Sequence, residues 1–367
     1  MERKIIEEKL ETLMKGFLPV LYQDDDPDYV SGKLGNGVEN RERYRYWEWT
    51  QGVGLFGLWK LFEKTKDEKY LKMLESYYDE RIKAGLPGKN VNTMAPILAL
   101  SYLAEYTGKE EYFSVAREWT SWLYDGGLDR TPEGGFQHRT TDDVNTGELW
   151  DDTLMMSVLP LANMGRIDKR DEYLEEAEYQ LLLHIEYLAD PVTGLWYHGY
   201  SFPRKDHFAA AFWGRGNSWA TIALPLFEEL LTLKPSLKRY VSTVLTRQVE
   251  AISKLQDESG FWHTLLDHSD EGSYLESSCT AGFGYGILEG IKDGLLDRKY
   301  IEVARKALPA VLDAIDENGV LNRCSYGTPM GRESQDFYRN IPIHPMPYGQ
   351  AMAMLFLMEA MDSELAD

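Results

Sequence analysis

Two adjacent carboxylates, Asp151 and Asp152, stand where the sequence predicts the start of a buried helix. Asp152 shares a helical face with Met155 and Leu159, which follow it at spacings of three and seven residues. An acid on an apolar face loses hydration, which raises its pKa and suits proton donation, whereas the helix dipole lowers the pKa. Asp152 is therefore a candidate general acid, with helix capping as the alternative, and Asp151 is a candidate cap or partner of Asp152.

The segment 198–215 concentrates positive charge in an acidic chain. Against the single acid Asp206, it holds His198, Arg204, Lys205, His207 and Arg215. These charges either form ion pairs at the surface or bind a small anion. The second interpretation relies on Arg215, whose guanidinium fork matches a carboxylate. Both interpretations remain open at this point.

Tryptophan is frequent in the predicted loops and at the predicted helix starts. The residues concerned are Trp47, Trp49, Trp150, Trp196, Trp213, Trp219 and Trp262. Aromatic faces gathered at one place suit stacking on sugar rings, whereas packing in the core is the alternative for each of them.

Several kinds of site are excluded by their missing motifs. The sequence has no HExxH or paired-cysteine spacing, no G-x-S-x-G elbow and no phosphate-binding loop. His138, His198 and His263 recur as part of a repeat, so we predict hydrogen bonding to a polar ligand and neither a metal nor a cofactor. The glycines of segment 282–286 are interpreted as close helix packing, and Cys279 and Cys324 as free buried thiols.

Helical periodicity dominates the chain that must position these residues. Apolar residues recur at spacings of three and four, and no alternating strand pattern is evident. The predicted helices cover 2–17, 45–64, 68–85, 92–107, 110–123, 148–165, 170–188, 213–233, 236–254, 275–293, 298–316 and 346–364.

An internal repeat groups these helices in pairs. A charged cluster followed by tyrosine opens a helix at Tyr70, Tyr112, Tyr173, Tyr240 and Tyr300. A glycine followed by a hydrophobic residue recurs in four later loops, at Gly135, Gly194, Gly260 and Gly319, with spacings of 59, 66 and 59 residues. Two markers that share one period indicate a helix-pair repeat.

The members of each pair differ in polarity. The helix before each tyrosine marker is apolar nearly all round, and the one beginning at the marker is amphipathic, which predicts an inner ring of buried helices inside an outer ring. We therefore predict an all-α fold, a six-hairpin (α/α)6 barrel, as a single domain over residues 1–367. The long loops after the outer helices are expected at one mouth of the barrel, where loops on a rigid scaffold commonly carry chemistry.

Composition limits the partners. The net charge of −21 argues against binding nucleic acid or an anionic membrane. No run of about 18 apolar residues occurs, and the charged start does not resemble a signal peptide, so we expect a cytoplasmic protein. A monomer or weak homo-oligomer is the expected state.

The combination of motifs resembles glycoside hydrolase family 105, the unsaturated rhamnogalacturonyl hydrolases, and more distantly the unsaturated glucuronyl hydrolases of family 88. The resemblance covers nearly the whole chain and rests on segments 47–54, 92–96, 149–155, 198–199, 213–219, 274–278 and 348–350. The most specific are Trp-x-Asp-Thr at 150–153 and Trp-x-Arg-Gly-Asn-x-Trp at 213–219, taken together.

The resemblance implies a six-hairpin barrel and a glycosidase that removes a 4,5-unsaturated uronic acid from the non-reducing end of a short acidic oligosaccharide of the rhamnogalacturonan or pectin type. Asp152 matches the acid/base of that family, and Arg215 would hold the uronate carboxylate. The other residues that it implies at the sugar site are Trp49, Asn92, His138, Trp150, His198, Trp213 and Trp219.

One departure concerns Asn92, because some relatives carry a second acid there and an amide cannot transfer a proton at neutral pH. Two other functions stay open on the residues alone. A sugar epimerase or isomerase would need facing histidines, for which His198 and His263 are candidates. A non-catalytic module that binds acidic oligosaccharides would keep the aromatic and arginine contacts without turnover.

Overall fold

The computed structural model of the chain describes residues 2–24, 30–32, 34, 37–38, 40–270 and 272–366, so both ends of the predicted domain 1–367 lie outside it. The described chain is mostly helical, which confirms the predicted all-α class. Within it, no helix is long and apolar enough to cross a membrane.

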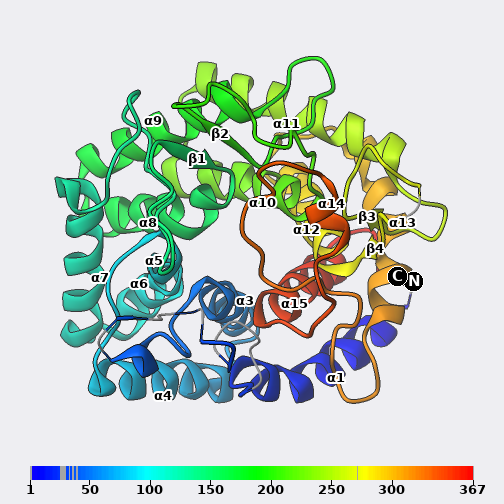
Figure 1. Cartoon of the computed structure of the whole chain (residues 1–367). Coiled ribbons are helices and arrows are strands. Elements are labelled where there is room, and N and C mark those ends of the chain that lie inside the picture. The colour runs from blue at the N-terminus through cyan, green and yellow to red at the C-terminus, as the bar shows by residue number, and fades with distance from the viewer. Residues whose placement is uncertain are drawn as a thin grey trace.

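The long helices form two concentric layers (Figure 1). The inner layer consists of α3 (Trp49–Thr65), α6 (Pro96–Thr107), α8 (Leu159–Asp168), α10 (Gly214–Leu231), α12 (Ser277–Lys292) and α15 (Pro347–Asp362). The outer layer consists of α1 (Arg3–Leu21), α4 (Glu68–Ala84), α7 (Glu110–Trp122), α9 (Asp171–Leu188), α11 (Pro235–Leu255) and α13 (Ile301–Ala314). Each inner helix contacts the next one in this order, and α15 contacts α3.

Polarity explains the two layers. In α6 every residue from Pro96 to Ala104 is buried, whereas in α4 the buried residues recur at helical spacings on one side. A helix that is apolar on all sides must be surrounded, and an amphipathic helix can face water. Each inner helix packs mainly against one outer helix: α3 with α4, α6 with α7, α8 with α9, α10 with α11, α12 with α13, and α15 with α1.

Short elements complete the described chain. They are the 3-10 helices η1 (Arg41–Arg43) and η4 (Arg298–Tyr300), the π-helical segments η2 (Leu123–Gly127) and η3 (Leu154–Val158), and the helices α5 (Val91–Met94) and α14 (Asp336–Arg339). Two antiparallel ribbons pair β1 (Glu148–Trp150) with β2 (Gly199–Ser201), and β3 (Trp262–His263) with β4 (Leu275–Glu276).

The ribbons correct the sequence prediction. Residues 148–150 and 275–276 were expected to open helices, but their backbone groups pair with a second strand. Tertiary pairing therefore overrides the local helical pattern there. The predicted helix 92–107 begins instead as the separate turn α5, and α6 starts at Pro96, which lacks an amide hydrogen to donate.

The repeated glycines hold neighbouring hairpins together. At Gly194, Gly260 and Gly319 φ lies between +80° and +93°, and a Cβ at any of them would meet the backbone of the next outer helix. Gly194 lies against Arg247 in α11 and Gly260 against Lys306 in α13. The last loop closes the ring, because Gly319 lies against Thr12 in α1.

Close packing of the inner helices confirms the interpretation of segment 282–286. A Cβ at Gly282 would meet Ser218 and Met352, and one at Gly286 would overlap the backbone of Thr221 in α10. Cys279 and Cys324 are free and buried, as predicted.

Replacing Gly319 by alanine is expected to destabilise the protein, because a Cβ would overlap the carbonyl of Thr12 in a left-handed backbone conformation. We expect a loss of about 1–2 kcal/mol from the backbone and about 1–3 kcal/mol more from overpacking. Urea unfolding followed by circular dichroism measures it. Gly108→Ala is the control, because Gly108 has φ +69° and nothing within 4 Å of its Cβ position. Equal losses in the two variants would contradict the closure contact.

Candidate active site

The β1–β2 ribbon brings the predicted acid and histidine together. Trp150 pairs with Gly199 in the antiparallel register, and the next backbone bond along the ribbon runs from the Asp151 amide to the His198 carbonyl at 3.0 Å. The chain turns into the helical segment at Asp152 immediately after this bond. Two residues 46 positions apart, Asp152 and His198, are thereby fixed side by side.

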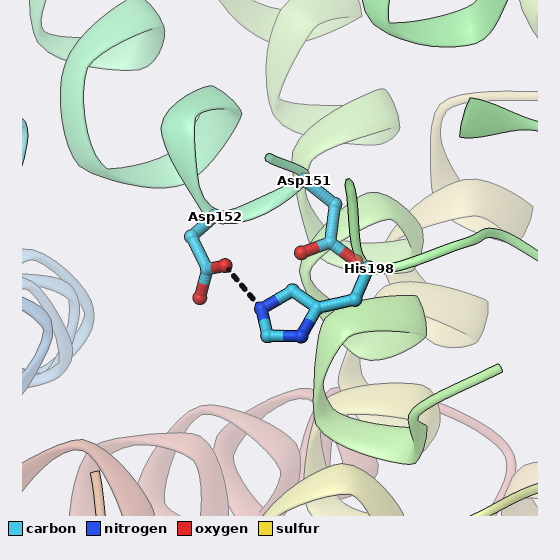
Figure 2. A group of neighbouring side chains, drawn as sticks. All are labelled: Asp151, Asp152 and His198. Atoms are coloured by element: carbon cyan, nitrogen blue, oxygen red, sulfur yellow. Dashed lines mark hydrogen bonds and ion pairs between the residues drawn. The ribbon is translucent and has the colours of Figure 1, made fainter. Parts of the chain in front are cut away.

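Asp152, His198 and Tyr338 form a chain of hydrogen bonds. The Nε2 atom of His198 lies 3.1 Å from Oδ2 of Asp152 (Figure 2). The Nδ1 atom of the same ring lies 2.7 Å from the Tyr338 hydroxyl. Burial raises the pKa of Asp152, but the hydrogen bond and charge of His198 outweigh it and lower the pKa below its usual range. The Asp152 side chain keeps 13% of its surface exposed against 1% for His198, so Asp152 is the member that a substrate can reach.

Asp151 lies beside the Asp152–His198 pair and is closed off from solvent. It is fully buried, and neither carboxyl oxygen accepts a hydrogen bond from a described donor. Burial raises the pKa of Asp151 well above its usual range, and the neighbouring charge of Asp152 raises it further. Figure 2 shows both carboxyl groups pointing toward His198 from one turn of the chain.

An aromatic wall stands beside the acid. The His138 ring stacks on Trp150 with centroids 4.1 Å apart, and its Nδ1 lies 2.8 Å from the Thr153 hydroxyl. Burial lowers the pKa of His138 to about 3, so the ring is neutral at physiological pH. Trp150 donates from Nε1 to Glu148 at 3.0 Å, and Glu148 pairs with Arg332 from the loop that leads to α15.

Arg215 is buried and held by protein acceptors. Its Nη1 donates to Ser325 and, at 2.7 Å, to the Tyr348 hydroxyl, and its Nη2 donates to the Tyr326 carbonyl at 3.1 Å. Its guanidinium carbon lies 4.2 Å from the ring centroid of Trp213. The fork predicted for a substrate carboxylate therefore already has partners at both ends, and only Nε lacks one.

The remaining predicted residues differ in access. Trp49 is partly exposed and stacks on Tyr348 with centroids 4.7 Å apart. Trp219 is fully buried behind Trp49 and meets it edge to face. Asn92 is partly exposed, and its side-chain amide makes no hydrogen bond within the described part of the chain.

The residues of the basic segment 198–215 divide between ion pairing at the surface and a place in the site. Arg204 pairs on the surface with Asp206 and Glu333, whereas His198 and Arg215 lie inside the site. The tryptophans divide as well, because Trp47, Trp196 and Trp262 are buried core residues.

Sequence reasoning missed Glu148, Arg332 and Tyr338. Glu148 and Arg332 are 184 positions apart, and Tyr338 reaches His198 across 140 positions. Arg332 and Tyr338 belong to the loop 322–346, which lies between α13 and α15 and includes α14. This segment crosses the end of the ring in Figure 1. Neither contact leaves a local pattern that could have revealed it.

Known proteins share this architecture and sequence. Residues 32–363 match the family model described as Glycosyl Hydrolase Family 88. The chain is 34% identical over 328 residues to the unsaturated rhamnogalacturonyl hydrolase YesR of Bacillus subtilis, which covers 87% of this chain and 90% of that protein. A crystal structure from Salmonella enterica serovar Paratyphi A, described as a possible member of the GH105 family, has 42% identity and a TM-score of 0.91 over 99% of this chain and 95% of that one.

A more distant structure shares the fold alone. The unsaturated glucuronyl hydrolase of Bacillus sp. GL1 has 19% identity and a TM-score of 0.71 over 98% of this chain and 96% of that one. With a reachable acid held by an imidazole beside aromatic rings, these matches define a glycoside hydrolase. The chain belongs to Glycosyl Hydrolase Family 88, and the predicted resemblance to families 88 and 105 is confirmed.

His138 makes stability depend on pH. An unfolded histidine has a pKa of about 6.5, whereas His138 in the folded chain has a pKa of about 3. Between these values the unfolded chain binds a proton that the folded chain does not, so stability falls as the pH falls, by up to about 1.4 kcal/mol per unit. His138→Gln should reduce this slope in urea unfolding between pH 6 and 4. The surface variant His268→Gln should keep the wild-type slope, and equal slopes in all three proteins would contradict the assignment.

Metal binding is a separate test. Asp151, Asp152 and His198 offer ligand atoms within 4.8 Å of one another, a donor set that divalent metals accept. We expect no metal there, because Asp152 and His198 bond directly and the raised pKa of Asp151 favours its neutral form. Calorimetric titration of EDTA-treated protein with Zn²⁺, Mn²⁺ or Ca²⁺ should show no stoichiometric binding. Binding that Asp151→Asn abolishes would contradict this expectation.

Proposed function

We propose that this glycosidase removes a 4,5-unsaturated uronic acid from the non-reducing end of acidic oligosaccharides that a polysaccharide lyase has produced, of the rhamnogalacturonan or pectin type. The observation that carries the proposal is the Asp152–His198 pair, in which the acid alone retains access to solvent. The relative named unsaturated rhamnogalacturonyl hydrolase supports the substrate class.

The reaction is hydration of the C4=C5 double bond. Asp152 gives a proton to C4, and water adds to C5 as its own proton returns to the carboxylate. The resulting hemiketal opens to a ketone, which leaves a hemiacetal at C1 that releases the rest of the chain. No nucleophile attacks the anomeric carbon, so the separation of two carboxylates does not determine the outcome as it does in ordinary glycosidases.

The surrounding residues divide the work of binding. Trp49 keeps part of its ring exposed to a sugar, with Trp219 supporting it from behind. Trp150 and Trp213 are buried and pack against the His198 ring. Asn92 offers an amide that can hydrogen-bond a sugar hydroxyl or the attacking water.

His138 and Arg215 complete the site. Neutral His138 buttresses Trp150. The charge of Arg215 favours the uronate carboxylate from a fixed position, because its Nη atoms already donate to Ser325, Tyr326 and Tyr348.

The scaffold that carries this site is a six-hairpin α/α barrel, one catalytic domain along the chain. The closed order of inner helices, each packed mainly against one outer helix, supports this architecture. The contact of α1 with α15 makes the sixth hairpin from helices near the two chain ends.

The structure gives little support to an epimerase with facing histidines. His198 bonds Asp152 and Tyr338, whereas His263 bonds the Ser273 carbonyl and lies 3.8 Å from Asp257. A non-catalytic binding protein differs from the hydrolase in turnover, and the acid held beside the aromatic wall favours the hydrolase.

Asp152→Asn tests the proposal, because an amide cannot donate the proton. With lyase-digested rhamnogalacturonan, the wild type should lose the ultraviolet absorbance of the double bond and release a keto-uronic acid. The variant should be slower by about 10²–10⁴-fold. Asp206→Asn, which removes a surface acid near the same loops, should retain the wild-type rate. A normal rate in Asp152→Asn would contradict the assignment of Asp152 as the proton donor. A product with the same mass as the substrate would favour the epimerase.

A further inference from the structure

Asp151 is a buried acid that the reaction above does not use. Its Oδ2 atom lies where a Cβ of residue 216 would be, so glycine at that position leaves room for the carboxyl group. Neither oxygen has a described hydrogen-bond donor, although the residue is fully buried. A buried carboxylate without donors is costly, because it loses its hydration and gains nothing in return. The chain nevertheless places it beside Asp152.

We infer that Asp151 and Asp152 act as one carboxyl pair that holds a single proton, with sealed Asp151 as its store and Asp152 as the member that reaches the sugar. Two carboxylate oxygens are both acceptors, so they can bond each other only when one carries a proton. Neighbouring carboxyls that cannot both ionise share a proton in this way. The inference rests on the proposed hydration reaction for its catalytic consequence.

The charges around the pair agree with this distribution. The hydrogen bond and charge of His198 lower the pKa of Asp152, while burial and the charge of Asp152 raise that of Asp151. Arg215 acts against the rise at Asp151 but does not reverse it. Tyr338 faces the pair from the loop 322–346. Burial raises its pKa and the charges of both acids add to the rise, so it stays neutral.

The pair solves a problem that Asp152 has alone. An acid ionised by its bond to His198 cannot protonate C4. In the proposed cycle the shared proton moves from Asp151 to Asp152, the C4–H bond forms, and positive charge develops at C5. Water adds at C5, one of its O–H bonds breaks, and that proton returns to the pair. No proton is consumed, and Asp151 serves as a positioning residue that touches no substrate.

Asp151→Asn tests the pair, because it keeps the volume of the side chain but cannot store the proton. The amide can donate to Asp152 and favours its ionised form, so the alkaline limb of the kcat profile should move to lower pH by about one unit or more. The rate at pH 8 should therefore fall at least about tenfold relative to that at pH 5. Asp168→Asn, which removes a carboxylate paired with Arg117, should leave the profile in place.

A second variant covers the case in which Asp151→Asn fails to fold. Gly216→Ala keeps every titratable group but places a Cβ against the Asp151 carboxyl. It should also move the alkaline limb to lower pH. An unchanged limb in the folded variants, with an ordinary loss of rate at all pH values, would reduce Asp151 to a structural residue.

Infrared spectroscopy reads the stored proton without any substrate. The wild type at pH 7 should show a protonated carboxyl band that Asp151→Asn lacks. Glu289 is the matched control, because burial raises its pKa to about 8 and it contributes a band of its own, which Asp151→Asn must retain. Identical spectra would overturn the inference. A lost band in a protein that hydrolyses no lyase product would instead count against the proposed function and leave the pair intact.

Discussion

The backbone bond between the Asp151 amide and the His198 carbonyl is the contact on which the site depends. It extends the β1–β2 ribbon by one residue and fixes Asp152 at hydrogen-bond distance from the imidazole. Without this pairing, the residues of 148–150 would continue the helical pattern of their sequence, and the acid would turn with the helix. In the ribbon, residues 148–150 bond to a second strand where they would otherwise make helical bonds. This pairing fixes residues that are distant in sequence next to each other, and the catalytic geometry follows from it.

Burial makes that constraint chemically useful. Asp151 and His198 have almost no contact with water, so charges act there at low dielectric. Burial and the charge of Asp152 raise the pKa of Asp151, and the hydrogen bond and charge of His198 lower the pKa of Asp152. Arg215 contributes a fixed positive charge, because its bonds to Ser325, Tyr326 and Tyr348 hold it in place before any ligand arrives. A preorganised charge of this kind stabilises a transition state without moving. The chain as a whole is strongly acidic, so under the proposed function Arg215 would favour an anionic sugar through local geometry rather than net charge.

The helices could be predicted because the helical period of about 3.6 residues shows in residues that are close in sequence. The predicted ranges match all twelve long helices of the described chain to within a few residues, apart from the starts at 45, 92 and 148. Asp152 was predicted on the same grounds, from the helical face that it shares with Met155 and Leu159, whereas Trp150 was predicted from its place at a helix start. The strands were not, because two or three residues are too few for alternation to appear. Tyr338 and Arg332 reach the site only through the loop 322–346, whose path depends on tertiary contacts.

The repeat connects stability with chemistry. Gly135 is followed three residues later by His138, and Gly194 is followed four residues later by His198. Each loop that packs against the next hairpin therefore also places a histidine at the end of the ring. The third loop likewise places His263 three residues after Gly260, but His263 bonds the Ser273 carbonyl and not Asp152. One structural unit thus supplies the same residue type at successive positions. The difference between a catalytic and a structural histidine then lies in the side-chain partner: the His198 ring bonds Asp152, the His138 ring bonds Thr153, and the His263 ring bonds the Ser273 carbonyl.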